Sequence, residues 1–186
     1  MARPMSDVRR LVVVAALGWA CCAASPSDPA RDDTIFFGMN VGTGVASVDQ
    51  ADLSGRWRGG LVYDAAFGFG LSDQWAAGLE LATWQPLNLN GDPTHVHQFG
   101  VRAEYALSGP DGWIAASSVG LALGDGRATK RLGGGGLVQL GHRWALGRWV
   151  AIAVEGGVHG AVYKDGTALA PFLAVQLRFY GQRPRD

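Results

Sequence analysis

The sequence GLVYDAAFGFGLSDQWAAGLELATW, residues 60–84, decides the fold of this chain. Up to Leu71 its odd-numbered residues are mostly large and apolar, whereas the even-numbered ones are small or, at Asp64, acidic. After residues 72–74 the alternation resumes, with Glu80 on the side of the small residues. Because successive side chains of a strand point to opposite faces, this period of two predicts an antiparallel hairpin with a short turn.

The same alternation recurs along the chain, and no stretch has the periodicity of a helix. The expected strands are residues 35–46, 60–71, 75–84, 95–107, 113–124, 133–144, 148–162 and 168–180. An even number of consecutive strands, each with one apolar face, predicts an all-β fold. Its architecture is expected to be an eight-stranded antiparallel up-and-down transmembrane β-barrel, with the apolar faces turned to lipid.

Composition supports a single domain with much apolar surface. Of the 186 residues 48% are hydrophobic and 17% charged, below the roughly 25% charge of soluble domains. Glycine is frequent, with 28 residues, which suits strands that curve or a crowded interior. The formal net charge is zero and no basic patch indicates nucleic-acid binding.

The N-terminus has the features of an export signal. Residues 1–24 combine basic residues, a short apolar run over 11–20 and small residues before a cleavage site, which predicts a signal peptide. A lipidated Cys21 and a twin-arginine signal at Arg9-Arg10 are open alternatives. Residues 25–33 would form a polar leader, residues 34–180 the β-barrel and residues 181–186 a polar tail.

The connections and the aromatic residues indicate which end of the barrel is which. Short connections, at 72–74, 108–112 and 145–147, fall at the end that holds both termini, as periplasmic turns do in outer-membrane barrels. Aromatic side chains collect near that end, where an amphipathic ring suits the headgroup layer. The expected aromatic girdle consists of Phe69, Trp75, Tyr105, Trp113, Trp144 and Phe179. Trp149 has the parity of the opposite face and fits the girdle less well.

The face opposite the apolar one carries nearly balanced charges. The expected polar network of the barrel interior consists of Asp64, Glu80, Arg102, Glu104, Arg143, Glu155 and Arg178, with Gln98, Gln139 and Gln176 beside it. An eight-stranded barrel is just wide enough for side chains, so buried charges there must pair. Glu80 and Arg102 are the preferred pair, and Asp64 also needs a cationic partner, Arg102 first. The alternative is that these residues face bulk water on an open sheet.

These features resemble the small eight-stranded outer-membrane barrels of Gram-negative bacteria, the group of the OmpA transmembrane domain and OmpX. The resemblance covers about residues 34–180 and rests on strand count, parity, the girdle and the closing strand PFLAVQLRFY, residues 171–180. It implies a monomer in the outer membrane whose partners are outer-membrane lipids and the outer-membrane assembly machinery. Such proteins usually end on an aromatic residue, whereas here six polar residues follow Tyr180.

Few residues suggest chemistry, and we expect no catalytic, metal or cofactor site. His95 and His97 share one face beside Asp92, but two clear ligands at a rim are more typical of a solvated surface than of a metal site. Ser117 and His142 are the best candidates for a nucleophile and base, without a carboxylate to orient the histidine. Residues 133–136, four glycines, are interpreted as a flexible strand entrance rather than a phosphate loop.

The sequence therefore favours a non-catalytic barrel with short surface loops and a structural or surface-interaction role. A lipid A-modifying barrel enzyme and a narrow channel are the alternatives, and a soluble exported barrel or sandwich is a further one. The specific ligand or partner does not follow from the residues.

Overall fold

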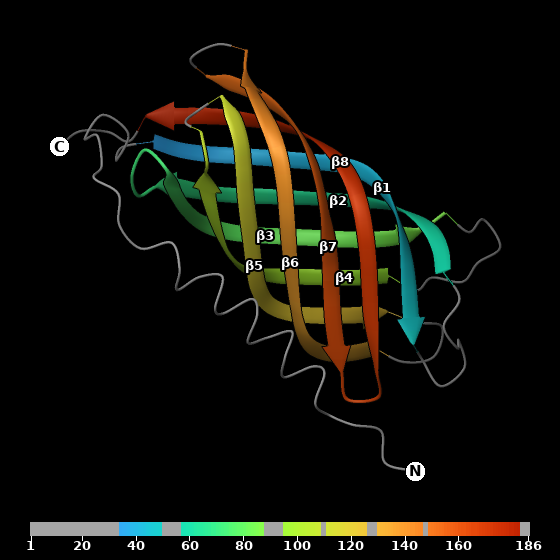
Figure 1. The fold of residues 1–186 in the computed structure, drawn as a ribbon. Helices are drawn as coiled ribbons and strands as arrows, with labels where there is room; N and C mark the ends of the chain where they lie inside the picture. The colour runs from blue at the N-terminus through green and yellow to red at the C-terminus, as the bar shows by residue number, and fades with distance from the viewer. Residues whose placement is uncertain are drawn as a thin grey trace.

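The computed structural model describes residues 34–49, 57–87, 95–108, 111–125, 130–146 and 149–182. Each strand pairs antiparallel with the next one in the chain, and the last pairs with the first, so the sheet closes into a barrel (Figure 1). This confirms the predicted eight-stranded antiparallel barrel. The strands are β1 (Thr34–Asp49), β2 (Trp57–Gly70), β3 (Trp75–Pro86), β4 (His95–Ala106), β5 (Gly112–Asp125), β6 (Lys130–Ala145), β7 (Val150–Tyr163) and β8 (Gly166–Gln182).

The two faces of the wall lie as the alternation predicted. In β2, Leu61 and Phe67 are exposed on the outside, whereas Val62 and Ala66 are buried inside. The large side chains thus point away from the barrel axis, the reverse of a soluble barrel. Among the described residues, no helix is long and apolar enough to cross a membrane.

The glycine run of β6 corrects one interpretation. Residues 133–136 are not a strand entrance, because β6 begins at Lys130 and the run is paired on both sides. Gly136, for example, lies opposite Val119 of β5 and Gly160 of β7. Glycine is a poor strand former on its own, and here the two neighbouring strands of a closed sheet hold it in the ladder.

The connections divide the barrel into two ends. We call the end with Thr34, Gln182 and the connections 71–74, 107–111 and 146–149 the short-turn end. The opposite, loop end holds the connections 50–56, 87–94, 126–129 and Lys164–Asp165. At the loop end several strands run further than expected: β1 ends at Asp49, β2 begins at Trp57 and β6 begins at Lys130. Of the connections at this end, only Leu87 and Lys164–Asp165 are among the described residues, and the predicted signal peptide, the leader and residues 183–186 lie outside them.

In two of the short turns a serine hydroxyl accepts a hydrogen bond from a backbone amide. In the β4–β5 turn the Ser108 hydroxyl accepts from the Trp113 amide at 3.0 Å. Gly112 in the same region has a φ of 142°, a backbone conformation that residues other than glycine rarely adopt. In the β2–β3 turn Ser72 accepts from the Trp75 amide at 3.1 Å. Trp149 belongs to the β6–β7 turn rather than to a strand, so strand parity does not apply to it, and its side chain is exposed.

Candidate functional sites in the lumen and on the outer wall

Glu104, which lies inside the barrel near the short-turn end, collects three arginines. Its Oε1 accepts from Nη1 of Arg143 at 2.8 Å and from Nη1 of Arg178, and its Oε2 accepts from Nη2 of Arg102 at 3.2 Å. All four side chains are almost fully buried. The pairing brings together β4, β6 and β8 across the lumen, because the interior of an eight-stranded barrel is just wide enough for side chains to fill.

Arg102 links this cluster to a second carboxylate. Its Nη1 donates to Oε1 of Glu80 on the neighbouring strand β3, so one guanidinium bridges Glu80 and Glu104. Glu80 lies two residues from Gly78, the direct register partner of Arg102, so the arginine reaches it diagonally across the two strands. Glu104 lies two residues further along β4, on the same inward face as Arg102. The structure therefore places the Glu80–Arg102 pair where the sequence suggested it.

Asp64 has a different partner from the one expected. The side-chain amide of Asn40 donates to both of its carboxylate oxygens, at 2.9 and 2.8 Å, and to Oε2 of Glu155 at 3.1 Å. Asn40 lies directly opposite Asp64 in the β1–β2 register and is 1% exposed. The position of Asn40 on the inward face could have identified it as an interior residue. The sequence does not give the register between β1 and β2, which places Asn40 opposite Asp64. We call Asn40 and the seven predicted interior residues the charged layer.

The half of the lumen toward the loop end is filled differently. A cluster of buried apolar side chains occupies it, with the Trp84 side chain fully buried. Its larger members, here called the apolar layer, are Val62, Trp84, Val96, Leu137, Tyr163 and Phe172. His159 lies on β7 four residues from Glu155 and four from Tyr163, at the boundary between the two layers, and is 2% exposed.

The apolar layer was missed at the sequence level. Inward positions were expected to be small or polar, and Trp84 ends the opening stretch on that parity. A tryptophan fits there because its inward neighbours are small: Cβ of a residue at position 60 would lie 2.5 Å from the indole, so Gly60 leaves room for it. The sequence did contain a signal for this packing, namely a large inward residue among small inward ones. Only the register between β2 and β3 shows that Trp84 and Gly60 lie side by side.

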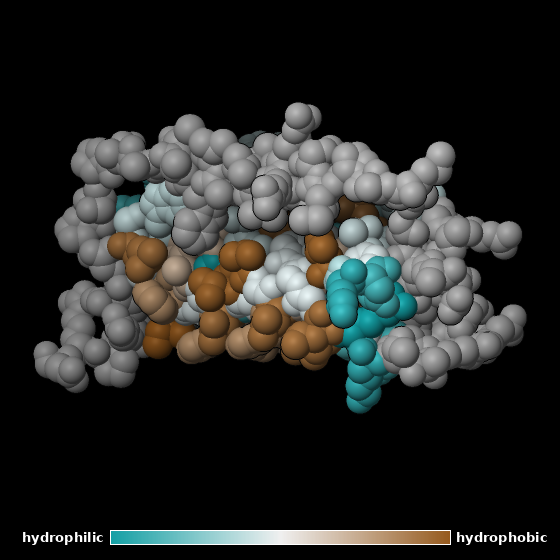
Figure 2. Space-filling model, turned by 90° about the horizontal axis from the view of Figure 1, so that it is seen from below, coloured by the Kyte–Doolittle hydropathy of each residue, from teal (hydrophilic) through white to brown (hydrophobic). Residues whose placement is uncertain are grey.

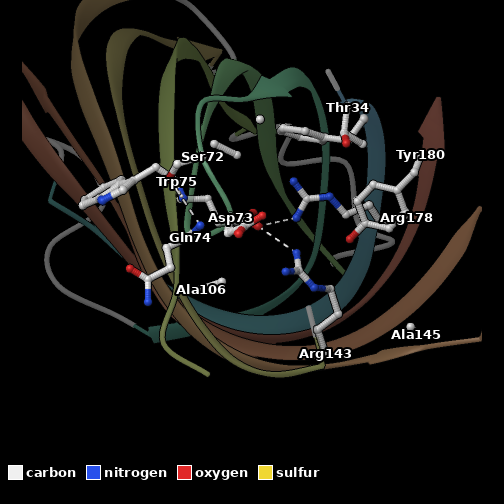
Figure 3. A pocket seen from close by; sticks show the side chains of 14 residues that line it. Thr34, Ser72, Asp73, Gln74, Trp75, Ala106, Arg143, Ala145, Arg178 and Tyr180 are labelled. Carbon is white, nitrogen blue, oxygen red and sulfur yellow. Dashed lines mark hydrogen bonds and ion pairs between the residues drawn. The ribbon is translucent and has the colours of Figure 1, made fainter. Parts of the chain in front are cut away.

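The short-turn end of the lumen opens into a cavity of about 320 Å³ (Figure 3). The guanidinium groups of Arg143 and Arg178 reach toward the same carboxylate at its floor, and Gln74 lines the rim. Arg178 also lies over the ring of Phe36, 3.7 Å from its centroid, a cation–π contact. Arg143 and Arg178 share the one carboxylate of Glu104, so the floor of the cavity is formed by an ion-pair cluster.

The outer wall is apolar on every strand. Figure 2 shows hydrophobic side chains over the visible wall, with hydrophilic ones gathered toward one end. Exposed large apolar residues occur on all eight strands, from Met39 on β1 to Leu177 on β8. A monomeric soluble protein rarely exposes an apolar patch of more than a few hundred Å², and larger patches mark contacts with a membrane or with another protein.

The six residues proposed as an aromatic girdle all lie on the outer face toward the short-turn end. Trp75 and Tyr105 contact each other with ring centroids 4.8 Å apart, and the Tyr105 hydroxyl donates to Oε1 of Gln74 at 3.2 Å. Phe69, Trp113, Trp144 and Phe179 are exposed.

The side chains with possible chemistry are not assembled into a reactive site. His142 lies opposite Trp113 and Ser117 opposite Val138, so the proposed nucleophile and base are four residues apart along the strands, about 13 Å at about 3.3 Å per residue. His97 is bound through Nδ1 to the Thr83 hydroxyl at 3.0 Å. Asp92 lies outside the described residues. Within the described part of the chain, no three histidine, cysteine or acidic side chains are arranged to hold a metal ion.

No family model matches this chain, and no curated protein matches its sequence. Among solved structures, Ail, the attachment invasion locus protein of Yersinia pestis, is similar with a TM-score of 0.54 and 8% identity over 77% of this chain and 98% of Ail. Neisserial surface protein A has a TM-score of 0.49 and 13% identity over 76% and 96%. The N-terminal β-barrel domain of Pseudomonas aeruginosa OprF has 0.46 and 15% over 80% and 99%.

The likeness to Ail shows a shared fold. The chain has the architecture of the small eight-stranded outer-membrane barrels.

Proposed function

We propose that this chain is a non-catalytic barrel of the outer membrane, with a structural or surface-interaction role. The observation that carries the proposal is the apolar belt on all eight strands around a lumen filled with side chains. A closed barrel satisfies every backbone hydrogen bond within the sheet, as a bilayer requires. The proposal includes outer-membrane lipids as surroundings, the outer-membrane assembly machinery as a partner during insertion, and a monomeric state.

The two alternatives have less support. A narrow channel would need a wet path, whereas residues of the apolar layer are buried and the charged layer is cross-linked by ion pairs. A lipid-modifying enzyme would need a nucleophile beside a base, and Ser117 and His142 are far apart. We therefore assign the proposed structural or surface-interaction role to the outer wall and to the surface at the loop end.

The test is membrane fractionation of the full chain made in a Gram-negative host, with gel mobility measured on the same sample before and after boiling. We expect the protein in the outer-membrane fraction, resistant to carbonate extraction, and a shift in mobility on heating. Extraction by carbonate alone, or a folded form without a heat-dependent shift, would overturn the proposal. Steady single-channel steps in planar bilayers would instead favour the channel.

A further inference from the structure

The outer wall carries one histidine in an unusual place. Away from the loop end, the outward positions of the eight described strands hold no Asp, Glu, Lys or Arg, and His142 is the one histidine among them. The other outward-facing histidines, His95 and His97, lie at the loop end of β4. A titratable side chain in an otherwise apolar and aromatic wall needs a reason, because burying it in lipid without a partner costs free energy.

Two tryptophans hold the His142 ring. The centroid of the Trp113 ring lies 5.5 Å away with the planes at 83°, and that of Trp144 lies 4.5 Å away at 43°. Trp113 is the direct register partner of His142 on β5, and Trp144 follows it by two residues on the same face of β6. Both tryptophans are about half exposed, so the three rings form one surface cluster.

The environment of the ring fixes which nitrogen faces outward. Nδ1 is buried and has no hydrogen-bond partner among the described residues, which leaves Nε2 at the surface. An unpartnered buried N–H costs more than an unpartnered lone pair, so in the neutral ring the proton sits on Nε2 and is donated outward. Asp111, an acid of the adjacent β4–β5 turn, accepts from the Ala145 amide through Oδ1.

We propose that Trp113, His142 and Trp144 form a binding site for the phosphate of an anionic phospholipid in the leaflet at the short-turn end. The inference rests on the proposed membrane-spanning role. The imidazole and both indoles carry N–H donors, the strands place no carboxylate on this face, and hydrogen bonds to a charged acceptor are the stronger ones. The cluster lies within the proposed girdle, where headgroups are expected.

The experiment uses the folded full chain in detergent with added dioleoyl-phosphatidylglycerol, and counts retained lipids by native mass spectrometry. Wild type should retain the lipid, and His142→Ala should retain about tenfold less, as expected for one hydrogen bond to a charged group. His142→Gln, which keeps an N–H donor, should retain an intermediate amount. His97→Ala removes a histidine from the same outer face at the loop end and should behave as wild type.

Heat-dependent gel mobility on each sample shows that the variants compared are folded, and His142→Gln provides the comparison if His142→Ala does not fold. Equal retention by wild type and both folded His142 variants would overturn the site. Displacement of the lipid by excess inorganic phosphate would support recognition through the phosphate group. Wild type that enters bilayers yet retains no lipid refutes this inference only, whereas wild type that carbonate washes off membranes refutes the proposed function.

Discussion

The two halves of the lumen solve the same packing problem with opposite chemistry. Toward the short-turn end, the charged layer fills the barrel with ion pairs centred on Glu104 and Arg102. Toward the loop end, the apolar layer fills it with Trp84, Phe172 and Tyr163. A barrel this narrow must be filled with side chains, and either chemistry can fill it. Charged groups need an ion-pair or hydrogen-bond partner, and apolar groups need complementary volume.

The charged half should respond most strongly to loss of one charge. Replacing Glu104→Gln leaves three buried guanidiniums without their shared carboxylate, and breaking a buried pair costs about 3–5 kcal/mol. The measurement is the free energy of unfolding in urea, followed by tryptophan fluorescence in phosphatidylcholine bilayers. Glu155→Gln is the matched control, because Glu155 is bound by the neutral Asn40 amide and should lose about 1 kcal/mol. Equal losses would show that the arginines do not depend on Glu104.

The apolar half should respond to volume instead. Trp84→Ala empties the centre of the layer and should lower the free energy of unfolding by about 3–5 kcal/mol in the same assay. Trp84→Phe should cost less than about 1.5 kcal/mol, because most of the ring volume remains and the buried indole N–H has no hydrogen-bond partner among the described residues. If Phe proved as costly as Ala, a polar contact of the indole would have to replace the volume argument.

A third test concerns the outer wall, where the cost of a charged residue should depend on its depth in the bilayer. Leu79 is exposed in the middle of β3, so Leu79→Arg should cost about 2–4 kcal/mol if that position faces the bilayer midplane. Val154→Arg on β7 should behave alike. Leu71→Arg, in the β2–β3 turn, should cost about 0–1 kcal/mol because it lies near the interface. A cost that does not depend on depth would contradict a wall immersed in lipid.

The smallest changes in stability are expected for alanine at two glycines of neighbouring strands, Gly120 on β5 and Gly134 on β6. A Cβ at Gly120 would lie 2.0 Å from the Phe99 carbonyl oxygen and 2.4 Å from Cα of Gly100, so Gly120→Ala should cost about 1–3 kcal/mol by overpacking. A Cβ at Gly134 meets nothing within 4 Å. Gly134→Ala should therefore be neutral or stabilising by about 0.5–1 kcal/mol. The measurement is again the free energy of unfolding. A lower stability of Gly134→Ala would contradict the open space found at this outward position.

The fold followed from the sequence to an unusual extent, because strand periodicity is a local property. The alternation in residues 60–84 already separated Phe67 and Leu79 from Asp64 and Glu80, and the structure keeps that separation. The glycine run over 133–136 was misread for the same local reason: glycine is a poor strand former, and nothing nearby in sequence shows that β5 and β7 hold it.

The sequence by itself determined that strands would form, which side chains share a face, and which charges the lumen must accommodate. Only the tertiary structure decided which side chains contact each other across the lumen. Asn40 binds Asp64, three arginines bind Glu104, and Trp84 packs against Gly60. The physical reason is that faces depend on a period of two within each strand, whereas partners depend on the stagger between strands. That stagger is fixed when the eight strands close and fill one narrow lumen.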